Sequence, residues 1–263
     1  MLHKFSDEIF KLEVPFCNIY TAVFFIKTQK GFAIVDTADK ASDAEDYILP
    51  AMKELGISED SVTAILLTHT HGDHVGGAAF LVERCKNAYV YGFSRPWNLS
   101  EADKFITLSD GDIIDESIKA IELKGHDLSN GGFLHIPSKT LISGDSIQLY
   151  GLDTYGLLIR YPKLYLESLK KLSILEIENI FASHNNVPLG ASAIGEKAVS
   201  EYISTAEKCL CEMIDFVKAN TQKGITETTE IQRLFIEEKQ KLYKDFPTAS
   251  FETVIDSIKK EYL

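Results

Sequence analysis

The sequence lacks several features that would assign it to a specialised class of protein. No apolar run approaches the eighteen or so residues that a membrane-spanning helix needs, so no membrane association is expected. The four cysteines form no CxxC pair, and we expect free buried thiols in a reducing cytosol. Lys and Arg number 27 against 39 Asp and Glu, and the formal net charge of −12 disfavours nucleic acid as a partner.

A secretory signal is also missing from the first residues. Lys4 is soon followed by Asp7 and Glu8, and the apolar stretch 22–26 is short and has no small-residue cleavage site. We therefore expect a cytoplasmic protein. Its 263 residues, 45% hydrophobic and 25% charged, suit one large domain with a small appendage.

Histidine, in contrast, is concentrated in one stretch. The apolar residues 64–67 predict a short buried strand, and His69, His71, Asp73 and His74 follow it before a glycine-containing turn into a helix. Residues two apart on an extended backbone project to the same side, so His69 and His71 can converge on one point. Asp73 and His74 can serve a second point. Imidazoles with a carboxylate suit Zn²⁺ or a neighbouring first-row metal, and this pattern favours a metal site over a polar loop that contains histidines by chance.

Strands alternate with helices up to about residue 185, which predicts an α/β core. We expect strands at 9–16, 18–27, 32–35, 63–67, 88–92, 117–123, 133–137, 140–143 and 179–182, and helices at 38–55, 78–85 and 163–175. Residues 93–112 read as irregular. Three helical segments, 196–220, 228–242 and 248–262, follow Gly195. We therefore predict an α/β domain over 1–190 and a helical extension, packed on this core, over 191–263.

Four further polar residues stand where predicted strands end. Taken singly, His126, Asp145 and His184 are ordinary loop or turn residues. Asp36 follows the strand 32–35 and has two equally good interpretations. It is either a cap of the following helix or a support of the histidine loop from behind.

The stretch His69-Thr70-His71-Gly72-Asp73-His74 resembles the HxHxDH motif of the metallo-β-lactamase superfamily, and the chain is similar to its glyoxalase II-like members. The likeness covers roughly residues 16–188. It implies a four-layered αββα metallo-β-lactamase fold with a helical C-terminal extension. It also implies that two metal ions are bound by seven residues, the first by His69, His71 and His126, the second by Asp73, His74 and His184, with Asp145 bridging both.

The same resemblance implies a dinuclear metallo-hydrolase whose nucleophile is a metal-bridging hydroxide. Asp145 and Asp73 are the expected catalytic carboxylates, since both hold the metal pair and Asp73 can orient the water. Zinc is the expected metal, with Fe or Mn as alternatives. The expected substrate is a small-molecule carboxyl ester, thioester or lactone. A phosphodiesterase and a non-hydrolytic metal or redox protein on the same fold remain alternatives. The sequence leaves the oligomeric state open.

Residues that contact the substrate are harder to predict. Tyr150, Tyr155 and Arg160 follow Asp145 in an aromatic, glycine-containing stretch, and a hydroxyl or a guanidinium there can bind an oxyanion or a carboxylate. Packing of a loop explains them better. His3 and His135 are expected to be structural. Asp127 and Ser183 differ from the residues that the family commonly has at these positions. Neither difference removes a metal ligand, but both are expected to alter the rim of the pocket.

Overall fold

The computed structural model describes residues 1–101, 104–152, 156–239 and 250–263. The chain divides into two compact units. Unit 1 comprises Met1–Glu122 and Ser129–Gly144, and unit 2 comprises Leu123–Leu128 and Asp145–Leu263. The predicted boundary between two domains after residue 190 is not tested by this division and stays a prediction.

The larger sheet of unit 1 has its strands in chain order. They are β1 (Leu2–Lys4), β2 (Ile9–Phe16), β3 (Ile19–Lys27), β4 (Phe32–Val35), β5 (Val62–Leu67), β6 (Tyr89–Gly92) and β7 (Phe105–Thr107). Neighbours from β1 to β4 pair antiparallel, whereas those from β4 to β7 pair parallel. Parallel neighbours need a crossover, and helices lie in the crossovers from β4 to β5 and from β5 to β6. The carboxyl end of β5 therefore opens directly into the histidine loop.

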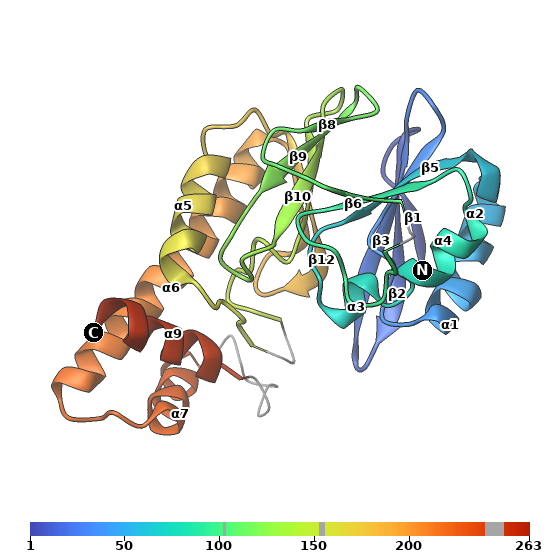
Figure 1. Ribbon diagram of the computed structural model, residues 1–263. Coiled ribbons are helices and arrows are strands. Elements are labelled where there is room, and N and C mark those ends of the chain that lie inside the picture. The colour runs from blue at the N-terminus through green and yellow to red at the C-terminus, as the bar shows by residue number, and fades with distance from the viewer. Residues whose placement is uncertain (102–103, 153–155, 240–249) are drawn as a thin grey trace. The chain divides into compact units, whose positions relative to one another are not determined.

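The connections between these parallel strands contain α1 (Ala41–Asp43), the π-helical turn η1 (Ala44–Ile48), α2 (Leu49–Glu54), the 3₁₀ turn η2 (Glu59–Ser61), α3 (Gly72–Val75) and α4 (Ala78–Arg84). Helices α1, α2 and α4 lie on one side of the sheet (Figure 1). The helix expected from residue 38 begins only at Ala41, since Asp36 and Ala38 have positive φ angles of 59° and 63°. Side chains of the sheet and helices share one buried cluster that includes Phe25, Ile34, Ile48, Met52, Leu67 and Leu81.

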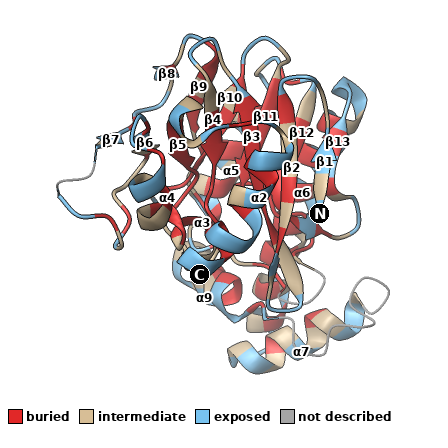
Figure 2. Cartoon of the chain, turned by 90° about the vertical axis from the view of Figure 1, so that its right-hand side faces the viewer, coloured by how far each residue is buried: buried red, intermediate tan, exposed pale blue. Residues whose placement is uncertain are grey.

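A second set of strands in unit 1 is antiparallel throughout. It consists of β8 (Ile113–Ile114), β9 (Ile118–Glu122), β10 (Gly131–His135) and β11 (Thr140–Gly144). The backbone N–H of Gly131 donates to the Thr68 carbonyl over 3.0 Å, and the rings of Phe93 and Phe133 lie 6.2 Å apart. These contacts join the second set of strands to the start of the histidine loop. Figure 2 shows that the central strands β3, β4 and β5 are mostly buried, whereas the edge strands β1 and β7 are largely exposed or intermediate.

Unit 2 combines a strand pair with long helices. Its elements are α5 (Pro162–Leu172), β12 (Asn179–Asn186), β13 (Gly190–Ile194), α6 (Glu196–Gln222), α7 (Thr228–Glu238) and α9 (Glu252–Tyr262). Helix α6 contacts α5, α7 and α9. The ring of Phe235 meets Phe216 and Phe251 edge to face, with centroids 5.4 Å and 5.5 Å apart. Such aromatic contacts stabilise the helical part beyond simple burial.

The mixed α/β class with two sheets is as the sequence predicts. Strands β1, β7, β8 and β13 were not predicted. The first three have only two or three residues, too few to show an alternating pattern. The predicted helix 228–242 ends at Glu238, and its last residues fall outside the described part of the chain. Within that part, no helix has the length and apolar character needed to cross a membrane. Cys85 and Cys209 are buried as expected, but Cys17 and Cys211 are exposed, so that prediction was wrong for two of the four.

Candidate metal centre

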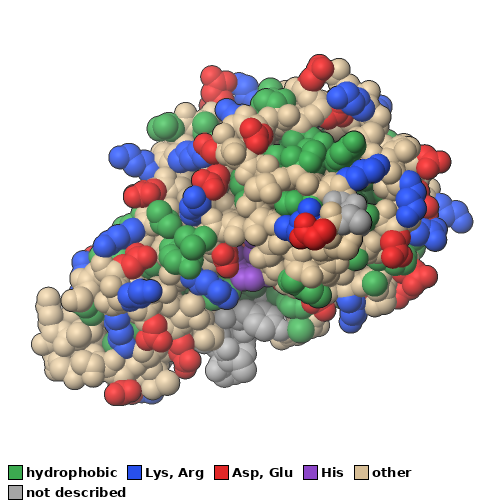
Figure 3. All heavy atoms as spheres, in the orientation of Figure 1, with side chains coloured by type: hydrophobic (Ala, Val, Ile, Leu, Met, Phe, Trp, Pro, Cys, Tyr) green, Lys and Arg blue, Asp and Glu red, His purple; other side chains and the backbone are tan. Residues whose placement is uncertain are grey.

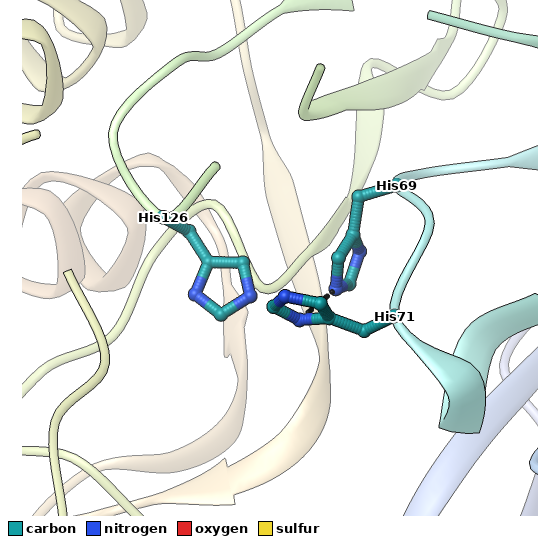
Figure 4. Close-up of side chains that lie close together, drawn as sticks. All are labelled: His69, His71 and His126. Atoms are coloured by element: carbon teal, nitrogen blue, oxygen red, sulfur yellow. Dashed lines mark hydrogen bonds between the residues drawn. The ribbon is translucent and has the colours of Figure 1, made fainter. Parts of the chain in front are cut away.

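The histidine loop runs from the end of β5 through the short helix α3. His69 and His74 are buried, whereas His71 and Asp73 are partly exposed. Nε2 of His69 lies 3.0 Å from Nδ1 of His71 (Figure 4). Two nitrogens bound to one tetrahedral Zn²⁺ lie about 3.3 Å apart, so this spacing suits a shared ion as well as a hydrogen bond. The structure thus brings His69 and His71 together, as the alternation of side chains predicts.

Asp36 supports this loop from behind. Its carboxylate accepts hydrogen bonds from the Thr68 N–H (2.9 Å) and the Thr68 hydroxyl (2.9 Å), and it faces Nδ1 of His74 at 2.7 Å. Thr68 Oγ1 also lies 3.1 Å from Nδ1 of His69. Because a carboxylate only accepts, these contacts place protons on both Nδ1 atoms and leave both Nε2 lone pairs available. Of the two interpretations of Asp36, the structure selects the supporting one, since Lys40 occupies the N-cap position.

Asp73 is held by a residue that the sequence did not single out. The hydroxyl of Thr21, buried in β3, donates to Asp73 Oδ2 over 3.1 Å. The same oxygen lies 3.3 Å from Nε2 of His74. A threonine within a β-branched, aromatic strand gives no signal in a single sequence, because it fits the strand pattern equally well.

Gly76 lets α3 approach the preceding connection closely. A Cβ atom added at Gly76 would lie 1.6 Å from the Asp39 carbonyl oxygen and 2.6 Å from the Lys40 nitrogen. Backbone atoms cannot move aside as a flexible side chain does. We expect Gly76→Ala to lower the free energy of unfolding by about 3 kcal/mol or more. Urea denaturation would measure it.

Gly56→Ala provides the matched control. Gly56 has a φ of +70° but nothing within 4 Å of an added Cβ. Alanine there pays only the backbone penalty of about 1–2 kcal/mol. Equal destabilisation by the two substitutions would contradict the close approach at Gly76.

The remaining three predicted ligands gather within unit 2. Asp145 directs one carboxylate oxygen to each of two imidazoles: Oδ2 lies 3.6 Å from Nε2 of His126, and Oδ1 lies 3.4 Å from Nε2 of His184. All three residues are at most 8% exposed. Charge is costly to bury without compensation, and a cation compensates a carboxylate that faces two imidazoles. The donor set therefore fits a divalent metal.

Local backbone geometry explains how these residues are presented. The sequence predicted that His184 follows the strand. It lies inside β12 instead, because this strand continues to Asn186. The pairing of β12 with β13 shifts register between Phe181 and Asn186, and this irregularity contains His184. Such irregularities re-aim a side chain out of the regular alternation. Residues 123–128, which contain His126, are held through the Gly125 carbonyl, which accepts from Arg160 N–H and Tyr161 N–H over 3.0 Å and 2.9 Å.

The predicted substrate contacts have structural partners. The Tyr150 hydroxyl donates to Glu212 over 2.9 Å, and Lys239 donates to the same carboxylate over 2.8 Å. Nη1 of Arg160 lies 3.8 Å from Oδ2 of Asp127, within the range of an ion pair. Tyr155 lies outside the described residues. Packing thus accounts for Tyr150, as the sequence favoured.

The two remaining histidines are placed away from the ligand set. His135 is buried, and its Nδ1 lies 2.7 Å from Ser138 Oγ within the turn between β10 and β11. Burial lowers the pKa of His135. His3 lies on β1, 3.4 Å from Glu13.

Comparison with known proteins agrees with this site. Residues 19–92 match the model of the metallo-β-lactamase superfamily. The chain is similar to a hydroxyacylglutathione hydrolase of Rhodopseudomonas palustris, 29% identical over 55% of this chain and 57% of the relative. It also resembles a β-lactamase-like protein 2 homolog of Caenorhabditis elegans, 25% identical over 84% of this chain and 75% of the relative. The chain thus spans somewhat more than half the length of the first relative.

Solved structures extend the likeness to the fold. A metallo-β-lactamase family protein from Thermus thermophilus superposes with a TM-score of 0.65 at 19% identity, covering 82% of this chain and 83% of that one. This likeness confirms the metallo-β-lactamase fold that the HxHxDH motif implied. Taken together, the motif, the match over residues 19–92 and the sequence relatives support the resemblance of this chain to the metallo-β-lactamase superfamily.

Proposed function

We propose that the protein is a dinuclear metal-dependent hydrolase of a small-molecule carboxyl ester, thioester or lactone. The observation that carries this proposal is the donor set itself. Four candidate ligands follow β5, and two of their rings, those of His69 and His74, are oriented by Thr68 and Asp36. The other three are Asp145 and the two imidazoles that face its carboxylate. Seven such donors are enough for three ligands to each metal and one bridge.

The assignment of ligands follows the family resemblance. His69, His71 and His126 would hold the first ion, and Asp73, His74 and His184 the second. Asp145 would bridge them, which is supported by its two oxygens facing two different imidazoles. When bound, a pair of divalent cations lowers the pKa of water and stabilises negative charge on the substrate. Zinc suits the mixture of imidazole and carboxylate, and Fe or Mn suits it as well.

In this proposal two carboxylates of the chain neutralise the metal charge and orient the reacting groups. Asp145 supplies the negative charge that holds two cations together. The Thr21 hydroxyl donates to Oδ2 of Asp73 and so fixes the orientation of this carboxylate. A carboxylate held in this way can orient a water molecule or a leaving group. No Ser or Cys nucleophile is required in this scheme, in keeping with the absence of a nucleophile from the motif.

The proposed substrate class rests on the relatives and on charge. A relative named hydroxyacylglutathione hydrolase acts, by its name, on a thioester. The net charge of −12 repels polyanions, and on the face seen in Figure 3 the basic side chains are interspersed with acidic ones. We propose a small-molecule substrate, no nucleic acid partner and a cytoplasmic location.

The reaction class has a direct test. Metal-replete protein is expected to hydrolyse a glutathione hydroxyacyl thioester or a simple lactone at neutral pH, with a kcat/KM at least about tenfold above that for a bis-aryl phosphodiester, because kcat/KM reports relative transition-state binding. A chelator should abolish both activities, and added metal should restore them. A tenfold preference for the phosphodiester would replace the carboxyl assignment with a phosphodiesterase. No turnover of either class would favour a non-hydrolytic protein.

A further inference from the structure

A buried amide beside His126 has no part in the ligand set. Gln148 lies three residues after Asp145 and is 4% exposed. Its Oε1 accepts the Leu158 N–H over 2.9 Å, which fixes the orientation of the amide and places Nε2 toward His126, 3.1 Å from Nδ1. A polar side chain is buried in this way only when its hydrogen bonds are made, so the arrangement needs an explanation.

The Leu158 carbonyl decides the protonation of the ring. It lies 2.8 Å from Nδ1 of His126, and a carbonyl oxygen can only accept. The Gln148 amide nitrogen, 3.1 Å from the same Nδ1, can only donate, so just one of the two contacts is a hydrogen bond. We assign it to the shorter contact, with the Leu158 carbonyl, so that Nδ1 of His126 has the proton and Nε2, which faces Asp145, retains its lone pair. Gln148 binds the N–H of the same residue whose carbonyl accepts this proton. The amide thus fixes Leu158, and Leu158 fixes the ring.

Tyr165 in turn fixes Gln148. Its hydroxyl, fully buried on α5, accepts the Gln148 N–H over 2.8 Å and donates to the Gln148 carbonyl over 2.9 Å. Burial raises the pKa of Tyr165, so the hydroxyl keeps its proton. The same tyrosine packs on Gly125, where an added Cβ would lie 2.5 Å from the Tyr165 Cα. One side chain therefore locates both the residue before His126 and the residue that orients it.

We propose that Gln148 is a positioning residue that, through Leu158, holds His126 as the Nδ1–H tautomer with Nε2 ready to bind a cation. The proposal rests on the proposed function only in naming that cation as a catalytic metal. Contacts behind a metal-bound histidine commonly change metal affinity about 10–100-fold. Gln148 is expected to act in this range, although it does not touch the metal.

Nitrogen NMR of the metal-free protein tests the tautomer without using activity. Histidine ¹⁵N shifts and long-range couplings, measured at one pH well above the ordinary histidine pKa, distinguish Nδ1–H from Nε2–H. The signal of His126 is identified by its loss in His126→Gln. We expect Nδ1–H in the wild type and in Gln148→Glu, whose carboxylate still accepts the Leu158 N–H. In Gln148→Met, which keeps the length but not the acceptor, we expect a mixture of tautomers.

A competition titration with a zinc chelator supplies the second readout. Gln148→Met should weaken binding of one Zn²⁺ about 10–100-fold and leave the other within about threefold, whereas Gln148→Glu should stay close to wild type. Asn220→Leu is the matched control, since it removes a buried amide of α6 whose side chain bonds the Phe216 carbonyl. If Gln148→Met does not fold, Tyr165→Phe removes the clamp on Gln148 and should shift both readouts in the same direction.

These readouts separate the inference from the proposed hydrolase. An Nε2–H ring in the wild type, or an unchanged tautomer and zinc affinity in Gln148→Met and Tyr165→Phe, overturns the positioning role whatever the activity. A confirmed tautomer and affinity change in a protein that hydrolyses none of the substrates above would retain the positioning role and reject the hydrolase.

Discussion

His71→Ala is expected to bind one metal ion fewer per chain and to lose at least about 100-fold in kcat, beyond the 10–100-fold typical of contacts behind a ligand. The ring of His71 places Nδ1 within 3.0 Å of Nε2 of His69, and alanine leaves that donor pair with one nitrogen. A cation held by fewer donors binds more weakly and leaves at ordinary metal concentrations. Metal analysis of purified protein and steady-state kinetics on a thioester measure the two effects.

His135→Ala is the control for this experiment. His135 is also buried, but it contacts Ser138 in a turn and belongs to no proposed ligand group. It should retain both metals and most of the activity. One metal per chain in saturated wild type, or full metal and activity in His71→Ala, would refute the proposed dinuclear assignment.

Asp36→Ala should destabilise the metal-free protein by about 3–5 kcal/mol. The change removes the acceptor of the Thr68 N–H, the Thr68 hydroxyl and the His74 ring, all of them buried. It also places alanine at a φ of +59°, which costs about 1–2 kcal/mol. Urea denaturation in excess chelator isolates this effect, because metal binding is absent from both proteins.

Asp36→Asn distinguishes the two contributions. Asparagine tolerates the left-handed conformation and keeps one oxygen for Thr68. It should therefore destabilise the protein by about 1–2 kcal/mol, less than alanine does. If alanine and asparagine were equally harmful, the negative charge and not the set of three hydrogen bonds would be the dominant contribution of Asp36. A loss below about 1 kcal/mol for alanine would show that Asp36 does not support the loop.

The sequence by itself determined the parts of this protein that depend on local pattern. Alternating β-branched and aromatic residues predicted β2 and β4 with their observed bounds, because side-chain alternation follows directly from strand geometry. The HxHxDH motif placed four candidate ligands in six positions, and its resemblance to a family indicated the fold and three further candidates. Helical spacing after Gly195 located α6 and α9, since an amphipathic face repeats every 3.6 residues.

Only the tertiary structure decided which residues hold the candidate ligands in place. Asp36 had two equal interpretations, and the choice required a helix that starts at Ala41 and a carboxylate that reaches His74 across 38 positions of sequence. Thr21, Gln148 and Tyr165 look like ordinary strand, loop and helix residues in the sequence. Their roles come from hydrogen bonds to Asp73, Leu158 and Gln148 over 52, 10 and 17 positions. Local pattern reports which side of an element is buried, whereas the partner of a buried polar group is set by chain folding between distant segments.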